Sequence, residues 1–244
     1  GRLYSDLIFT GLPRMPTPGT EVYAEGFGIH VGGGAPITAA HLADEGAHTM
    51  LSAFLPPAPF ADMAKDELRA HSIDIALSKA TPSGTGPQLT VAMIHDADRA
   101  FLTRRVGEAF PSISSDDLVS AGVDHVHVGE LATLIERPEI IDVARRANAS
   151  ISLDCSWDEN LSRDAIGDLI GCVDVFLPNE NEVAHLRELG VAEPFAPMTV
   201  IKQGRDGATA FNADLEVGAP VSAMPVLDAT GAGDAFNAGF LVAW

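Results

Sequence analysis

Short apolar runs separated by polar turns characterise the first third of the chain. Leu7–Phe9 and Phe27–Val31 flank a segment rich in proline and glycine, within which Val22–Ala24 is also apolar. A second pair of runs follows at Gln88–His95 and Ala100–Thr103. Runs rich in β-branched and aromatic residues and bounded by turn residues are typical of strands. We expect all of these runs to be extended and to pair into a small sheet apart from the main body.

Two segments between these strands have a helical pattern. Ala35–Glu45 is rich in alanine and is followed by Gly46, a residue suited to the position just after a helix. Ala61–Ala70 repeats the pattern. Both segments are therefore predicted to be helices.

From about residue 117 onward, apolar strands and helices alternate. The predicted strands are Val123–Val128, Ser150–Leu153, Val173–Leu177 and Thr199–Ile201, and the predicted helices are Ile140–Ala149, Ala165–Gly171, Glu180–Leu189 and Ala235–Ala243. This alternation indicates βαβ units and a mostly parallel sheet with helices on both faces. Such connections are right-handed, and ligands bind at the carboxyl ends of the strands.

Composition narrows the class of protein. The chain has 244 residues, of which 46% are hydrophobic, and its formal charge is −19 from 15 basic and 34 acidic residues. This suits one sizeable globular domain and argues against a nucleic-acid partner, which clustered lysine and arginine would bind. No apolar run of about 18 residues is present, so we expect no membrane span. Cys155 and Cys172 form no C-x-x-C pair, which indicates reduced thiols and a cytoplasmic protein.

The densest chemical signal lies at residues 228–234, with the sequence D-A-T-G-A-G-D. The small residues from Gly231 to Gly233 leave backbone N–H groups open just before a predicted helix. A glycine-rich turn at a helix N-terminus favours anions, because the unpaired N–H groups and the helix dipole both attract negative charge. Asp234 lies in that first turn, where a carboxylate acts either as a cap or in chemistry.

Two further motifs follow predicted strands. Asn179–Glu182 begins a helix, and its acidic residues either stabilise the helix dipole or position Mg²⁺, which prefers oxygen ligands. Lys202–Gly207 contains two glycines, which suit an ordinary hairpin turn between two strands. His125 and His127 share one strand face; with no third ligand spaced nearby, sheet packing is favoured over a metal site.

The motif at 228–234 resembles the second signature, D-T-x-G-A-G-D, of the ribokinase-like carbohydrate kinases (the phosphofructokinase-B family). Ala229 stands at a common threonine position, and the other residues agree. The resemblance implies a three-layer α/β/α fold with a mostly parallel central sheet and a small β-sheet lid. It also implies that 1–244 is a single kinase domain, with lid segments near 7–31 and 87–104.

The resemblance also implies an activity. A sugar kinase of this family transfers the γ-phosphoryl group of ATP to a carbohydrate hydroxyl, with Mg²⁺ as a second cofactor. By the resemblance, Asp234 is the general base and the backbone of Gly231, Ala232 and Gly233 steadies the transferring group. The remaining assignments are Asn179, Lys202, Gly204, Gly207 and Thr230 to the nucleotide, Glu182 to Mg²⁺ through water, and Asp228 to a monovalent cation.

The substrate side resembles the family as well. Gly1 and Asp6 reproduce the spacing G-x-x-x-x-D, and Gly32–Gly34 lies where the family has a di-glycine loop. This implies that Asp6, expected at a strand end, contacts sugar hydroxyls together with Gly32 and Gly33. A carboxylate suits that role because it accepts several hydrogen bonds. Ile37 stands where the family usually has asparagine, so the identity of the sugar stays open.

Alternatives remain. A nucleoside kinase shares this fold and these motifs, and a catalytically silent sugar- or nucleotide-binding relative is a second possibility. A Rossmann oxidoreductase is disfavoured, because no G-x-G-x-x-G follows the first strand. The apolar lid strands make a homodimer through the lid plausible. We also expect strand and helix elements to flank Gly1 and Trp244, and the 190–198 connection is short where the family has another helix.

Overall fold

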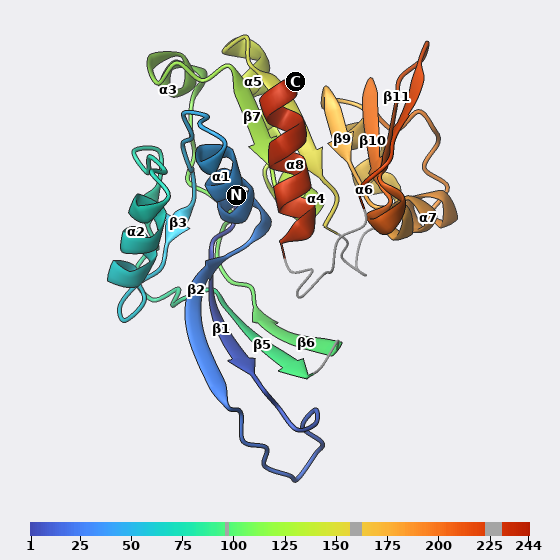
Figure 1. Ribbon diagram of the computed structural model, residues 1–244. Helices are drawn as coiled ribbons and strands as arrows, with labels where there is room; N and C mark the ends of the chain where they lie inside the picture. The colour runs from blue at the N-terminus through green and yellow to red at the C-terminus, as the bar shows by residue number, and fades with distance from the viewer. Residues whose placement is uncertain (96–97, 157–162, 223–230) are drawn as a thin grey trace. The chain divides into compact units, whose positions relative to one another are not determined.

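The computed structural model describes residues 1–95, 98–156, 163–222 and 231–244 (Figure 1). The described chain divides into two compact units, of which one is Arg2–Pro111 and the other is Gly1 with Ser112–Trp244. Asp228 and Thr230, assigned above to a cation and to the nucleotide, lie outside the described residues.

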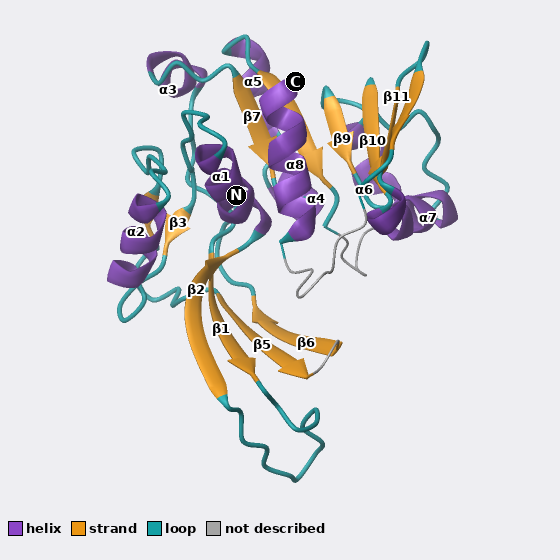
Figure 2. Cartoon of the chain, viewed as in Figure 1, coloured by secondary structure: helices purple, strands orange, loops and turns teal. Residues whose placement is uncertain are grey.

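The unit formed by Arg2–Pro111 contains a four-stranded sheet with the order β2-β1-β5-β6 (Figure 2). Its strands are β1 (Tyr4–Thr10), β2 (Gly26–Gly32), β5 (Leu89–His95) and β6 (Asp98–Arg104). The two pairs of apolar runs therefore form one small sheet, as expected. The expectation for Val22–Ala24 is wrong, because these residues lie outside any strand, in the loop that precedes β2.

The two faces of this sheet differ in polarity. Asp6 pairs with His30 and Thr90, whereas the next residue, Leu7, pairs with Ile29 and Val91. Since successive side chains of a strand point to opposite faces, one face is polar around Asp6 and the other is apolar. The apolar face consists of Leu7, Phe9, Phe27, Ile29, Val91, Met93 and Leu102.

The same unit carries two helices with a core of their own. α1 (Gly34–Asp44) begins directly after β2, and α2 (Ala61–Ala70) has the bounds that the pattern predicts. Gly46 adopts a φ of +89° just after α1, a conformation that glycine takes without a steric penalty. The short strands β3 (Phe54–Leu55) and β4 (Lys79–Ala80) pair in parallel. The buried core includes Leu3, Ala39, Leu51, Leu68 and Ile73.

The second unit is built on a six-stranded sheet with the order β12-β11-β10-β9-β8-β7. Its strands are β7 (His125–Val128), β8 (Ser150–Asp154), β9 (Val175–Leu177), β10 (Met198–Lys202), β11 (Ala208–Phe211) and β12 (Glu216–Ala219). Its helices are α3 (Ser115–Ser120), α4 (Leu131–Glu136), α5 (Glu139–Arg146), α6 (Arg163–Ile170), α7 (Glu180–Glu188) and α8 (Ala232–Ala243). β7 to β10 are parallel, while β11 and β12 add an antiparallel edge. The hairpin interpretation of Lys202–Gly207 implies the first of these two strands, and β12 was not predicted. None of the described helices has the length and apolar character that crossing a membrane requires.

Three layers follow from this strand order. β7 to β10 are adjacent in chain order, so right-handed crossovers place α5, α6 and α7 on one face of the sheet. α8 covers the other face, where Phe236 and Phe240 pack against a cluster of strand residues. That cluster is Val175, Leu177, Val200 and Ala208. The predicted α/β/α fold with a mostly parallel central sheet is confirmed for this unit.

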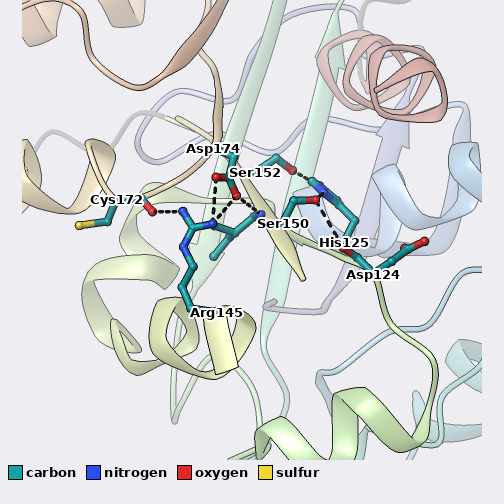
Figure 3. Close-up of polar contacts among 8 residues, drawn as sticks. Asp124, His125, Arg145, Ser150, Ser152, Cys172 and Asp174 are labelled. Carbon is teal, nitrogen blue, oxygen red and sulfur yellow. Dashed lines mark hydrogen bonds and ion pairs between the residues drawn. The ribbon is translucent and has the colours of Figure 1, made fainter. Parts of the chain in front are cut away.

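An ion pair fastens the start of β8 to the neighbouring connections (Figure 3). Arg145 of α5 donates to both carboxylate oxygens of Asp174, at 2.9 and 2.8 Å, and to the carbonyl oxygen of Cys172 at 3.0 Å. Asp174 also accepts from the Ile151 N–H at 2.7 Å. These contacts lie at the amino-terminal end of the strand, away from the edge where ligands bind in parallel sheets.

The two strand histidines pack within the sheet. His125 Nδ1 lies 2.7 Å from Ser150 Oγ, and His125 Nε2 lies 2.7 Å from Ser152 Oγ (Figure 3). His127 Nδ1 lies 2.8 Å from the same Ser152 Oγ. Burial lowers the pKa of His127 to about 4, so this imidazole is neutral at physiological pH. The serine hydroxyl groups of β8 are therefore the partners of both imidazoles.

Candidate functional site

The start of α8 provides a set of open backbone donors. Gly231 is the N-cap with a left-handed φ of 74°, and the helix begins at Ala232, three residues earlier than the apolar pattern predicts. Gly233 therefore belongs to the first helical turn rather than to a preceding loop, and Asp234 lies in that turn as predicted. The first N–H groups of a helix have no acceptor within the helix, and the dipole adds positive potential there. This turn can bind an anion such as a phosphate.

A buried polar cluster joins this helix to the ends of two strands. Lys202 Nζ, at the end of β10, donates to Asp154 Oδ1 at 2.9 Å and to Asn237 Oδ1 at 3.2 Å. Asn237 Nδ2 donates to Asp154 Oδ2 at 2.7 Å, which closes the cluster. Asn237 is fully buried, and the side chains of Lys202 and Asp154 are only 13% and 11% exposed. We call these three residues the Lys202 cluster.

The ammonium of the Lys202 cluster lies beside the first turn of α8. A Cβ atom placed on Gly233 would be 3.5 Å from Lys202 Nζ, an ordinary van der Waals distance. Only a glycine therefore leaves the space between the ammonium and the helix start open. A full positive charge and the N-terminal end of a helix thus face the same small region.

Asn179 and Glu182 form a reciprocal cap at the start of α7. The Asn179 side chain accepts from the Glu182 N–H at 3.0 Å, and Glu182 Oε2 accepts from the Asn179 N–H at 2.7 Å. This is the capping-box arrangement. Glu182 is 8% exposed, so its carboxylate is mostly withdrawn from water. Asn179 and Glu182 therefore do stabilise the start of α7. A role of Glu182 toward Mg²⁺ stays a prediction.

The strand ends bring Asn179 next to Lys202. The two residues form a parallel bridge, and the Lys202 N–H donates to the Pro178 carbonyl oxygen at 2.8 Å. Asn179, two residues after β9, and Lys202, at the end of β10, thus lie at the carboxyl ends of adjacent parallel strands. In open α/β sheets this edge is where ligands bind.

The glycines at 204 and 207 shape the hairpin between β10 and β11. Gly204 and Gly207 have φ values of 55° and 95°, on either side of a short 3₁₀ turn, Gly204–Asp206. A Cβ atom on Gly207 would collide with the carbonyl oxygen of Ala219 on the strand β12. The hairpin interpretation of this loop therefore accounts for both glycines, and its nucleotide role stays a prediction.

The substrate-side residues lie in the other unit. Asp6 is inside β1 rather than at a strand end, so that part of the prediction is wrong. Its carboxylate occupies the space that a Cβ atom on Gly32 would take. Gly33 has a φ of 104° and passes so close to the Arg2 carbonyl oxygen that a side chain is excluded. Ile37 lies on α1 and lines a cavity of about 210 Å³ between α1 and α2.

Asp6 has an unusual electrostatic environment. Burial raises the pKa of its carboxyl group from 3.8 to about 6; nearby Glu67 raises it further, while a hydrogen bond from Thr90 and the proximity of His30 lower it. Within the described part of the chain, the buried atom Asp6 Oδ1 has no hydrogen-bond partner. A buried acceptor without a donor is unfavourable, so a ligand hydroxyl at this position would stabilise it.

Sequence reasoning missed Asp154 and Asn237 as members of a polar cluster. Asp154 ends a buried strand, and Asn237 is the one amide in the apolar segment Ala235–Ala243. A polar residue within an apolar helix requires a partner when it is buried, and this signal could have identified Asn237. Asp234 is partly buried in the first turn, as predicted, and its proposed role as a base is taken up below.

The fold and the helix start, which can bind a phosphate, place the chain in the class of α/β proteins that bind ligands at the carboxyl ends of parallel strands. Within this class, the pattern of the pfkB family of carbohydrate kinases matches residues 6–244. The chain belongs to this family. The resemblance noted in the sequence is thereby confirmed over nearly the whole chain.

Three proteins show how far the similarity extends. The chain is 27% identical over 189 residues to the ATP-dependent ribose-1-phosphate kinase of Halopiger xanaduensis, covering 75% of this chain and 62% of that protein. It is 28% identical over 212 residues to the 2-dehydro-3-deoxygalactonokinase of Haloferax volcanii, covering 77% of this chain and 66% of that protein. The chain thus spans less than two thirds of the length of both relatives. The ribokinase of Thermotoga maritima has the same fold, with a TM-score of 0.82, 17% identity, and coverage of 100% of this chain and 83% of that chain.

Gly233→Ala should separate anion binding from helix stability. Alanine favours a helix over glycine by about 1 kcal/mol, so the variant should be at least as stable as the wild type. Its methyl group fills the space beside Lys202 Nζ, so nucleotide affinity should fall by about tenfold or more, as expected for losing a hydrogen bond to a charged group. Calorimetric titration with ATP measures the affinity, and thermal denaturation measures the stability.

Gly239→Ala is the matched control for this prediction. It makes the same change in the same helix, at a position where a Cβ atom meets nothing within 4 Å. This variant should gain stability and keep wild-type nucleotide affinity. Equal affinities for the two variants would contradict an anion site at the first turn of α8.

Asp6→Asn should stabilise the protein increasingly as the pH rises. The pKa of Asp6 is about 6 in the folded protein against 3.8 for an unperturbed aspartate, so its protonated form contributes stability that is complete below pH 3.8 and lost as the pH rises through 6. Asparagine does not titrate, so its advantage should grow by about 1 kcal/mol from pH 5 to pH 8. Urea denaturation at both pH values checks this, with Asp168→Asn at an exposed helix position as control. An advantage that shrinks with rising pH would refute the burial of Asp6.

Proposed function

We propose that this protein is an ATP-dependent carbohydrate kinase that transfers the γ-phosphoryl group of ATP to a sugar hydroxyl. The observation that carries the proposal is the placement of the Lys202 ammonium beside Gly233, in the first turn of α8 and next to Asp234. Phosphoryl transfer depends mostly on positioning and on electrostatic stabilisation of the transferring group. A helix start, a lysine and a carboxylate together supply donors, charge and a base for that reaction.

In this mechanism Asp234 accepts the proton of the attacking hydroxyl. The N–H groups of Gly231, Ala232 and Gly233 steady the charge on the transferring group, and Lys202 binds phosphate oxygens. The dipole of α8 favours negative charge at the helix start, which suits a carboxylate that accepts a proton there. We assign Gly204, Gly207, Asn179 and Thr230 to the nucleotide on the strength of the family resemblance.

The oxygen atoms of two side chains that follow β9 suit a hard cation. Glu182 and Asn179 carry oxygen ligands of the kind that Mg²⁺ prefers, and Mg²⁺ commonly keeps several waters between itself and a protein. We therefore assign Glu182 to Mg²⁺ through water, and Asp228 to a monovalent cation by the resemblance. When bound, Mg²⁺ supplies positive charge that offsets the phosphates. The chain's own contribution there is to hold the carboxylate in place through the capping box.

On the substrate side we propose that the Asp6 carboxylate accepts hydrogen bonds from hydroxyl groups of the sugar. Gly32 leaves room for this carboxylate, Gly33 keeps the loop close to the strand, and Ile37 takes part in selecting the sugar. The two units would then act as one kinase domain, 1–244, in which the four-stranded sheet is the lid. A closed lid excludes water and so suppresses hydrolysis of ATP.

The apolar face of the four-stranded sheet supports a homodimer. Phe27 and Leu102 are 57% and 69% exposed, and the Phe9 and Phe27 rings pack with centroids 5.0 Å apart. Exposed apolar patches of this kind mark interaction surfaces. We propose that the same face of a second copy covers it.

A cytoplasmic location is the compartment we propose for the protein. Cys155 and Cys172 are both free, as expected in a reducing environment. Burial raises the pKa of the Cys155 thiol, so this residue is an inert core group rather than a nucleophile.

A screen of ATP consumption over sugars, sugar phosphates, sugar acids and nucleosides tests the proposed function, using the full-length protein with Mg²⁺. Turnover with a carbohydrate is the expected result. Turnover with nucleosides alone would favour a nucleoside kinase. ATP binding without turnover on any acceptor would identify a silent relative.

Asp234→Asn should lower kcat by about 10²–10⁴-fold, the usual contribution of a positioned base. Nucleotide binding should persist, because the backbone donors of the first turn are unchanged. Asparagine replaces aspartate well at helix starts, so stability should be nearly unaffected. Steady-state kinetics and calorimetry with ATP measure the two effects, and near-normal kcat would rule out Asp234 as the base.

Glu182→Gln and Glu182→Ala should separate metal binding from helix capping. Glutamine keeps the capping box but removes the charge, whereas alanine removes both. If Glu182 holds Mg²⁺-bound water, both variants should require more Mg²⁺ for half-maximal turnover, and only alanine should lower the melting temperature. A glutamine variant with the wild-type Mg²⁺ dependence would leave Glu182 as a cap alone.

A further inference from the structure

The Lys202 cluster joins three elements that are distant in sequence. Asp154 ends β8, Lys202 ends β10, and Asn237 lies one turn into α8; all three belong to the same unit. Each pair within the cluster is hydrogen-bonded, at 2.7 to 3.2 Å. A closed ring of this kind fixes the direction of every polar group in it.

The donors of the ammonium group show what the ring leaves open. A lysine ammonium has three N–H bonds, and two of them go to Asp154 and Asn237. In the described ranges no acceptor takes the third, and a Cβ atom built on Gly233 would lie 3.5 Å from Nζ. We propose that Asp154 and Asn237 are positioning residues that hold the Lys202 ammonium toward the first turn of α8, where it binds the polyphosphate of the nucleotide. This inference rests on the proposed kinase function and deepens it.

Holding the strands β8 and β10 together does not explain why the Lys202 cluster includes Asn237. β8, β9 and β10 are already joined by backbone ladders, so an ion pair between Asp154 and Lys202 adds little to their alignment. Asn237 contributes both an acceptor and a donor, and so sets where the ammonium lies relative to the helix. Lysine has a flexible four-carbon stem, and fixing it before the ligand arrives reduces the ordering required on binding.

The same unit contains an ion pair that serves as a reference. Arg145 and Asp174 pair at 2.8 Å, and Asp174 also accepts from the N–H of Ile151 near the start of β8, the end opposite Asp154 (Figure 3). Asp174→Asn is thus the same chemical change as Asp154→Asn, made in an ion pair that does not face the helix start. A purely structural role for Asp154 predicts that the two variants behave alike.

The experiment measures the affinity of the full-length protein for ATP and for adenosine, which lacks phosphates. Lys202→Met, Asp154→Asn and Asn237→Ala should each weaken ATP binding, by about tenfold or more for the first two, while changing adenosine binding by less than about twofold. Asp174→Asn should lower the melting temperature and keep the wild-type preference for ATP over adenosine. Asn237→Ala retains the ion pair, so it tests the inference even if Asp154→Asn fails to fold.

The outcomes separate this inference from the proposed function. If the wild type phosphorylates an acceptor but folded Asn237→Ala and Asp154→Asn retain its preference for ATP, the positioning role is overturned while the kinase assignment stands. If ATP and adenosine binding weaken equally in these variants, the cluster is structural and the inference is also overturned. Failure of the wild type to bind ATP would refute the proposed function itself.

Discussion

The hydrogen bonds to the buried carboxylate of Asp154 are the interactions on which the proposed phosphate site depends. Removing a charge from water costs several kcal/mol unless donors compensate it. Asp154 has three: the Cys155 N–H at 2.8 Å, Lys202 Nζ at 2.9 Å and Asn237 Nδ2 at 2.7 Å. These donors come from β8, β10 and α8, so satisfying one carboxylate places a helix start over the ends of parallel strands. Phe236 and Phe240 then hold the rest of α8 against the sheet.

Two glycines, which have no side chain, matter to the proposed sites as much as the charged residues do. At Gly32 the absence of a Cβ atom makes room for the Asp6 carboxylate, and at Gly233 it leaves the Lys202 ammonium open to the helix start. In each case a charged group lies against a backbone that has been kept bare. The two arrangements have opposite sign: one offers acceptors to hydroxyl groups, the other offers donors to an anion. This division matches the needs of an enzyme that binds a sugar and a nucleotide.

The fold was largely predictable because its elements are periodic. α2 has its predicted bounds, and the apolar runs predicted β1, β2, β5 and the parallel strands to within a few residues. The expectation for Val22–Ala24 was wrong because a run of three apolar residues is a weak strand signal, and these residues lie in the loop before β2. α8 begins earlier than its apolar pattern because Gly231 sets its cap. The Lys202 cluster was not predictable from pattern, since Asp154 and Asn237 are 83 residues apart and meet only through tertiary packing. Motif resemblance supplied the site residues, whose roles still await measurement.

The charge of the chain accounts for the form of the anion site that we propose. A protein with a net charge of −19 repels a nucleotide polyphosphate at long range, and lysine occurs only at 65, 79 and 202. Within the Lys202 cluster the ammonium is matched by Asp154, so the cluster adds no net charge. Attraction must therefore be short-ranged and directional, from N–H groups and an oriented ammonium whose field acts over a few ångströms. Such a site discriminates by geometry, because an anion gains from it only when its oxygens reach the donors of the first turn of α8.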